Sequence, residues 1–247
     1  MCFSEKQSYI NAFILICGSI YVYPKYRLMI VLIFLALKDL IQGFLYKFQN
    51  NEKIENILAV LSWIHISFQP LFVNLFMSHF SQNKNNYWNI IFIICFLYGI
   101  YTLTTLNEFD IQNDPKCSIR KNGIDVESIN AFLHLRKKKK VNDFCSKETG
   151  SYIGKYHIAY KFNRDNDILF FPIIYNILMY IPSLFTNSRI LSIIWFAFVS
   201  FIMFFFNNIG EGEKAAIWCF LSIIYILPVA IFNKQILKSL KKINKLL

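Results

Sequence analysis

The sequence lacks the short motifs that mark the common nucleotide-binding and hydrolytic enzymes. It contains no glycine-rich dinucleotide loop, P-loop, HExxH or GxSxG segment. It also lacks the alternating segments of about ten residues from which a transmembrane β-barrel is built. Charged side chains make up only 17% of the chain, and the stretches 87–106 and 190–207 contain none. These absences exclude the motif-bearing enzyme classes and a barrel, and they direct attention to the uncharged stretches.

Apolar residues dominate what is present. Hydrophobic residues account for 55% of the 247 positions, 26 of them are Phe, and the mean hydropathy is +0.40. A helix rises about 1.5 Å per residue, so it needs about 20 apolar residues to cross a hydrocarbon core of about 30 Å. We therefore predict an all-α, polytopic transmembrane helix bundle of about seven helices. The predicted spans are 9–24, 28–47, 55–79, 87–106, 168–185, 190–207 and 214–232.

The chain divides into four parts along this pattern. Residues 1–106 hold transmembrane helices 1–4, 107–166 form a basic extramembrane loop, 167–232 hold helices 5–7, and 233–247 form a basic amphipathic tail. We interpret the first stretch as a mature span, because it lacks the basic leader and the small-residue cleavage site of a signal peptide.

Lysine and arginine are distributed unevenly over the two predicted sides of the membrane. We call the side of the N-terminus side A and the side of the C-terminus side B. In its short segments, side A carries Lys6, Lys47, Lys53 and Lys214. Side B carries Lys25, Arg27, Lys84, Arg189, Lys234, Lys238, Lys241, Lys242 and Lys245. Short cytoplasmic segments are enriched in such residues, which predicts that side B and the C-terminus are cytoplasmic.

Part of the net charge of +11 gathers in two basic segments. One is a run of five basic residues from Arg136 to Lys140, and the other is the tail, where Ile236 and Leu240 recur at helical spacing. Both suit either a solvated charge run or contact with anionic lipid headgroups, to which each cation contributes about 1 kcal/mol. No nucleic-acid recognition motif accompanies the charge, so we predict a lipid bilayer and no nucleic acid as partner.

The cysteines on the predicted side A allow two chemistries. In an oxidising compartment, Cys117 and Cys145 would form a disulfide that closes a 29-residue loop and stabilises it by ~3 kcal/mol. In a reducing compartment they would stay thiols near His134 or His157, but their spacing matches no standard zinc pattern and we predict no metal site. Cys2 is either an incidental or acylated thiol or, after removal of the initiator methionine, an N-terminal nucleophile.

The second predicted span carries polar side chains deep in the membrane. Lys38 and Asp39 lie near its middle, and Gln42 follows one turn after Lys38. An ionisable residue at such a depth costs about 2.5–3.5 kcal/mol, so it is a candidate for function. The alternative is a Lys–Asp pair that only neutralises its own charges.

The third predicted span carries Ser62, His65 and Gln69 on one stripe, directly before Pro70. The short connection makes the second and third spans antiparallel neighbours, with the two polar groups at similar depth. We predict that they form one intramembrane site, and the alternative is that they only supply interhelical hydrogen bonds. Glu211 and Glu213 precede the last span; they are either helix-cap residues or, with Cys2 and His157, a second site on side A.

Four segments carry a resemblance. The opening MCFS (1–4) resembles the start of an uncharacterised multipass membrane family found in giant DNA viruses, algae and bacteria. SWIHISFQP (62–70), YHIAY (156–160) and EKAAIWC (213–219) are similar to its giant-virus, mimivirus-like members. The resemblance spans the whole chain and implies a host or viral membrane, but it implies no biochemical activity. Bacterial members carry a carboxylate where this chain has Gln42, so a shared acid–base role would fall to Asp39.

Three functions fit these patterns. The first is transport of a small solute, or sensing of a ligand, at a polar site between helices 2, 3 and 7. The second is a membrane-embedded, lipid-directed hydrolase or acyltransferase, with His65 or His157 as the base and Cys2 as the nucleophile. The third is a structural role in a viral or host membrane. We favour the first, and the sequence specifies neither a catalytic residue nor a cofactor.

Overall fold

The computed structural model describes residues 4–48, 51–81, 85–104, 150–153, 158–161, 171–205, 217 and 223–243. Several sequence predictions concern other positions. Cys2, Cys117, His134, the run from Arg136 to Lys140, Cys145, His157, Glu211 and Glu213 all lie outside the described residues.

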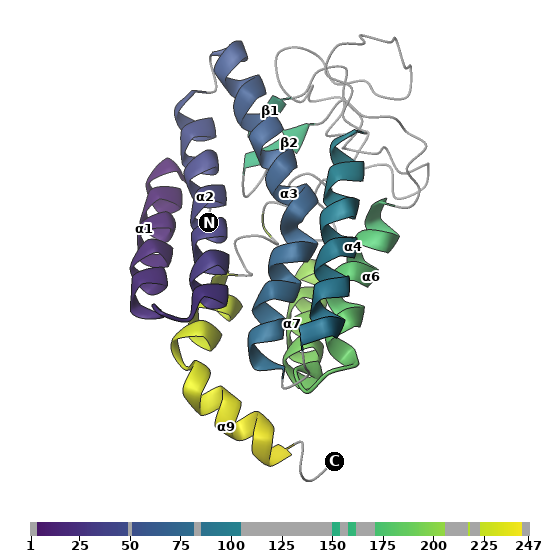
Figure 1. Cartoon of the computed structure of the whole chain (residues 1–247). Coiled ribbons are helices and arrows are strands. Elements are labelled where there is room, and N and C mark those ends of the chain that lie inside the picture. Colours follow the sequence, from purple (N-terminus) through teal and green to yellow (C-terminus); the bar gives the residue numbers. More distant parts are fainter. Residues whose placement is uncertain are drawn as a thin grey trace.

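Four antiparallel helices form the N-terminal part of the bundle (Figure 1). They are α1 (Glu5–Tyr21), α2 (Tyr26–Lys47), α3 (Glu52–Phe80) and α4 (Asn85–Leu103). Side-chain caps mark the first residues of α1 and α3. Ser4 accepts a hydrogen bond from the Gln7 amide at 3.3 Å, which satisfies one of the free N–H groups of the first turn of α1. Asn51 does the same for the Ile54 amide in α3.

Three of these helices are long and apolar enough to cross a membrane. The qualifying stretches are Tyr26–Lys47, Lys53–Phe80 and Asn86–Leu103, of 22, 28 and 18 residues. A fourth candidate combines the helical segments Ile223–Ile231 and Asn233–Ile243, which meet at an angle of 87°. The prediction of a bundle of transmembrane helices is thus confirmed for three to four candidate spans, and seven spans are not shown.

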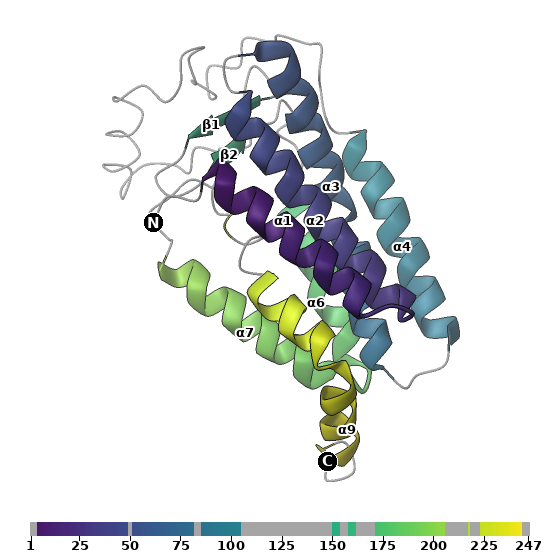
Figure 2. The same cartoon turned by 90° about the vertical axis from the view of Figure 1, so that its left-hand side faces the viewer.

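The C-terminal half contributes shorter helices. From here on, side A is the end of the bundle where α2 joins α3, and side B is the opposite end. α6 (Phe171–Leu184) runs toward side B, and α7 (Arg189–Phe205) runs back beside it (Figures 1 and 2). After Ile223–Ile231 the chain bends into α9 (Asn233–Ile243), which extends away from the bundle at side B.

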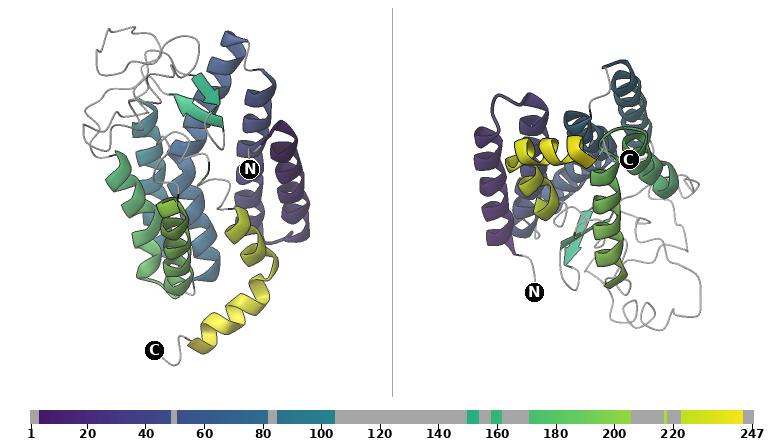
Figure 3. Two further views of the ribbon diagram at one scale, coloured as in Figure 1. Left: turned by 180° about the vertical axis from the view of Figure 1, so that it is seen from behind. Right: turned by 90° about the horizontal axis from the view of Figure 1, so that it is seen from below.

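A β-hairpin lies near the side-A ends of α2 and α3 (Figure 3). Its strands β1 (Gly150–Ile153) and β2 (Ile158–Lys161) are antiparallel, with Ser151 opposite Tyr160. For 107–166 we predicted only a basic loop, and the hairpin was missed. The reason is that two strands of four residues show too little alternation to be recognised as strands.

The apolar core is divided into two clusters along α2. The larger cluster reaches from side B to Ala36 of α2 and includes the fully buried Trp88 and Trp195. The smaller cluster lies at side A and consists of Leu45, Leu58, Trp63, Ile66 and Ile158. The stretch of α2 between Ala36 and Leu45 contributes no buried member to either cluster. This is the stretch that carries the predicted polar residues.

Side chains of α3 and α4 donate hydrogen bonds to two carbonyls of α6, one of which has lost its helical donor to a proline. Pro182 has no N–H, so the carbonyl of Leu178 lacks its donor within the helix. The Asn74 amide of α3 supplies one instead, with Nδ2 2.7 Å from that carbonyl oxygen. The Tyr87 hydroxyl of α4 donates to the Pro182 carbonyl at 2.6 Å. These two bonds hold α6 against α3 and α4.

Candidate functional site

Three buried polar side chains of α2 form the centre of the candidate site. Lys38, Asp39 and Gln42 are 3%, 1% and 1% exposed. The ammonium of Lys38 lies 3.3 Å from Oδ1 of Asp39, so the two charges compensate each other. Among the residues that the structure describes, neither Oδ2 of Asp39 nor Nε2 of Gln42 has a hydrogen-bond partner. Buried polar atoms are rarely left in this state, so these two are candidates for contact with a ligand or with water.

His65 of α3 bonds to the backbone of the same part of α2. Its Nε2 lies 3.0 Å from the carbonyl oxygen of Phe34. A carbonyl oxygen only accepts, so Nε2 carries the proton and Nδ1 of the neutral ring is an acceptor. Within the described part of the chain, Nδ1 has no partner. Phe34 precedes Lys38 by one helical turn, and Lys38 is close enough to the imidazole to interact with it electrostatically.

The ring of Phe34 is stacked between two side chains of α3. Its centroid lies 3.7 Å from that of His65, with an interplanar angle of 13°, and 3.6 Å from that of Phe72, with an angle of 9°. We call these three rings the aromatic stack. They close the α2–α3 interface between Lys38 and the side-B end of the bundle. The sequence analysis missed both phenylalanines, because a phenylalanine in a span carries no signal that it stacks on a histidine.

Ser62 and Gln69 are buried like the other predicted residues, but they bond elsewhere. The Ser62 hydroxyl donates to the Leu58 carbonyl of its own helix at 2.9 Å. Oε1 of Gln69 accepts a hydrogen bond from the hydroxyl of Tyr175 in α6, a residue that the sequence analysis did not single out. The structure therefore joins Lys38 to Asp39 directly and brings His65 near Lys38, whereas Gln69 bonds to α6.

A small void lies next to Phe34 and Phe72 of the aromatic stack. A void of about 10 Å³ lies between α2, α3, α7 and the segment Ile223–Ile231, and Phe34, Gln69 and Trp195 are among the residues that line it. This is about the smallest volume that holds one water molecule. Lys38, Asp39 and Gln42 do not line this void, and their burial keeps their polar atoms from solvent.

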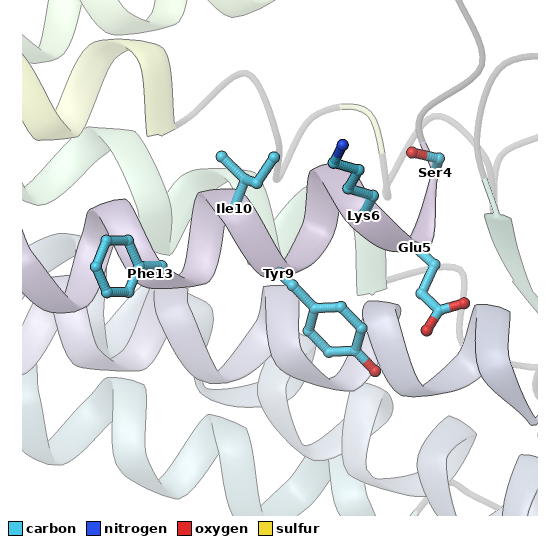
Figure 4. Close-up of a pocket in the computed structure, with 6 residues that line it drawn as sticks. All are labelled: Ser4, Glu5, Lys6, Tyr9, Ile10 and Phe13. Carbon is cyan, nitrogen blue, oxygen red and sulfur yellow. The ribbon is translucent and has the colours of Figure 1, made fainter.

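A larger hollow of about 660 Å³ lies over the start of α1 and not at the polar residues (Figure 4). Glu5 and Tyr9 point toward α2 there, whereas Lys6 and Ile10 point to the other side of α1. Because these side chains do not converge on one point, we assign no site to this hollow.

The described residues do not suggest a metal centre. Within the described ranges, no group of three His, Cys, Asp or Glu side chains lies close enough together to hold a metal ion. Cys17 is an exposed free thiol, and Cys95 is a buried one. The question of a Cys117–Cys145 disulfide concerns residues outside these ranges.

Long apolar helices that bury an ion pair and a histidine between them are the features of a multi-span helical membrane protein. The described residues contain three to four candidate membrane-spanning helices, which indicates that the chain is an integral membrane protein whose partner is the lipid bilayer. The chain belongs to a family of unknown function, DUF5765, which matches residues 7–240. No curated protein and no solved structure matches it. The predicted resemblance to an uncharacterised family is confirmed to that extent, and the giant-virus branch stays a prediction.

Proposed function

We propose that this protein binds a small polar solute, for transport or for sensing, at the buried polar residues of α2 and α3 and the last apolar stretch, 214–232. The observation that carries the proposal is the carboxylate of Asp39, which is 1% exposed and has one oxygen without a partner among the described residues. Ionisable residues inside membrane helices are costly and rare, and they commonly mark a solute or ion pathway.

The unpaired atoms indicate what kind of solute would suit the site. Oδ2 of Asp39 and Nδ1 of His65 are acceptors, and Nε2 of Gln42 is a donor. A small molecule that offers N–H or O–H groups together with one acceptor would satisfy all three. An amino acid or a polyol meets this requirement, whereas a protonated amine lacks the acceptor and a purely anionic solute lacks the donors.

The proposal is tested by ligand-dependent thermal unfolding of the full chain in detergent. The probes are a panel of amino acids, polyamines and polyols. We expect one chemical class to raise Tm, since a ligand at 100 times its Kd stabilises the folded state by about 2.7 kcal/mol. Gln42→Met should abolish the rise, and so should Lys38→Met combined with Asp39→Leu, which removes both charges of the buried pair.

Ser192→Ala is the matched control, because it removes a buried hydroxyl of α7 that is already bonded to the Tyr180 carbonyl. This variant should keep the full response to the same probe. A panel in which no probe raises Tm, or a rise that both site variants retain, would reject the proposed binding site.

Two other predictions remain beside this one. A lipid-directed hydrolase or acyltransferase would need Cys2, which lies outside the described residues, together with His65. The unpaired Nδ1 of His65 suits a base, but the side chain is 5% exposed and its ring is stacked on that of Phe34. A structural role in a viral or host membrane would need no such polar atoms, so we favour binding.

We further propose seven crossings, with side B and the C-terminus in the cytoplasm. α1, α6 and α7 run alongside the longer helices and are apolar, which supports counting them as crossings. The excess of short-segment Lys and Arg on side B supports the orientation.

We also propose that α9 binds anionic lipid headgroups at side B. Lys234, Lys238, Lys241 and Lys242 are exposed along this helix. Its apolar side packs inward, with Leu240 4% exposed and Ile236 and Leu237 against the larger core cluster. The bend of 87° before α9 takes the helix out of the direction of the bundle and toward the plane of a membrane surface.

Changing these four lysines of α9 to Gln should remove a stabilising effect of anionic lipid. We expect the parent protein to have a higher Tm in nanodiscs that contain phosphatidylserine than in phosphatidylcholine alone, by an amount that falls as salt is added. The four-lysine variant should show no such difference. A variant with Lys6, Lys47 and Lys53, exposed lysines of side A, changed to Gln is the control and should keep the difference. An equal loss in both variants would contradict a specific role of α9.

A further inference from the structure

The β1–β2 hairpin is attached to both helices that carry the polar residues. β1 is bonded to α3 through Glu55, whose Oε1 accepts hydrogen bonds from the amide of Ser151 at 2.6 Å and from its hydroxyl at 3.0 Å. β2 is bonded to α2 through Tyr46, whose hydroxyl accepts from the amide of Ile158 at 3.0 Å. Each strand is thus hydrogen-bonded to one helix, and the hairpin bridges the pair (Figures 1 and 3).

The inner side of the hairpin covers the polar residues from side A. Ile158 of β2 is fully buried and belongs to the smaller apolar cluster with Leu45 and Leu58. Leu45 follows Gln42 by three residues on α2, and the carbonyl of Leu58 accepts the hydrogen bond of Ser62 on α3. The apolar layer under the hairpin is therefore one turn from the polar side chains.

A second closed layer lies on the other side of the same residues. The aromatic stack lies between Lys38 and the side-B end of the bundle. In it the Phe34 ring is held between those of His65 and Phe72. The polar side chains are enclosed between this stack and the hairpin layer. A solute that moves toward Asp39 along the axis of α2 and α3 would meet one of the two layers.

We propose that the β1–β2 hairpin is the side-A closure of the polar site, and that it opens by release of Ser151 from Glu55. This inference rests on the proposed binding function and adds the route by which solute enters. The two layers differ in construction. The stack consists of rings fixed on two packed helices, whereas the hairpin is a two-stranded element, which is only marginally stable on its own and depends on its attachments. The hairpin is therefore the layer that separates first.

The closure is tested by labelling the full chain in nanodiscs with a water-soluble maleimide. The reporter is Ser62→Cys, a near-isosteric change at a buried residue, and peptide mass spectrometry separates its labelling from that of the native cysteines. In this background Glu55→Ala removes the acceptor of both Ser151 bonds and should raise the labelling rate about tenfold. Tyr46→Phe removes the hydrogen bond of the Ile158 amide and should raise the labelling rate as well. This variant replaces Glu55→Ala if Glu55→Ala reduces expression.

Two controls make the result specific. Asn56→Ala changes the exposed neighbour of Glu55 and should leave the labelling of Ser62→Cys unchanged. A second reporter, Ser78→Cys, is buried near side B beside Arg27 and should not respond to Glu55→Ala, whereas general loosening of the fold would raise its labelling too.

The outcomes separate this inference from the proposed function. A Ser62→Cys labelling rate that neither Glu55→Ala nor Tyr46→Phe changes overturns the closure, whatever the solute response shows. A rise at both reporters also overturns it. If labelling rises at Ser62→Cys alone but no probe raises Tm, the hairpin is a closure and the binding function is rejected.

Discussion

Full-length protein that carries Lys38→Met is expected to lose most of its folded fraction in detergent. The substitution leaves the carboxylate of Asp39 buried without the ammonium that lies 3.3 Å from it. Removing one partner of a buried ion pair costs about 3–5 kcal/mol, because the remaining charge stays buried and uncompensated. Unfolding by SDS titration in mixed micelles measures the change in free energy.

A control variant and a double variant show whether the Lys38–Asp39 pair serves stability or solute binding. Lys47→Met changes an exposed lysine of the same helix and should alter the free energy of unfolding by no more than about 0.5 kcal/mol. Lys38→Met combined with Asp39→Leu removes both charges and should recover most of the lost stability. A stable double variant without solute response assigns the pair to binding. A Lys38→Met protein as stable as its parent would contradict the buried pairing.

Asn74→Ala is expected to destabilise the protein by about 1–2 kcal/mol, at the upper end of interhelical hydrogen bonds in membranes. The Leu178 carbonyl has no helical donor because of Pro182, so the loss of the 2.7 Å bond from Asn74 leaves it unpaired in an apolar surrounding. The same SDS titration reports the change, and Asn89→Ala, at an exposed position of α4, is the control.

A double-mutant cycle with Pro182→Ala tests this explanation. Residue 182 then has an N–H that can bond to the Leu178 carbonyl within α6, so Asn74→Ala should cost less in that background. Equal costs in the two backgrounds would show that Asn74 acts through its other contacts, among them the 2.8 Å bond to the Pro70 carbonyl.

The longer helices could be predicted closely from the sequence. The expected spans 28–47 and 55–79 correspond to Tyr26–Lys47 and Glu52–Phe80, because long apolar stretches leave few alternatives to a helix. The sharp bend between Ile223–Ile231 and α9 was not predicted, although the amphipathic tail was. Periodicity identifies the faces of a helix but says nothing of the angle between two successive helices.

The residues of the candidate site could be predicted from the sequence, whereas the contacts that they make could not. Charges inside a span are visible in the sequence, and so Lys38, Asp39 and His65 were found. The partner of His65 is the backbone carbonyl of Phe34, and a carbonyl is present at every residue, so no sequence signal identifies it. In the same way, Glu55 reads as an ordinary first-turn carboxylate until the fold brings Ser151 to it.

His65 joins α2 and α3 in two ways at one place, by its bond to the Phe34 carbonyl and by its stack on the Phe34 ring. Sliding α2 along α3 by one residue would shift that carbonyl by about 1.5 Å and misalign both interactions together. The two helices should therefore move as a single rigid body during any working cycle. Spin labels placed on both would report a constant separation, and displacement has to be sought between this pair and the elements around it.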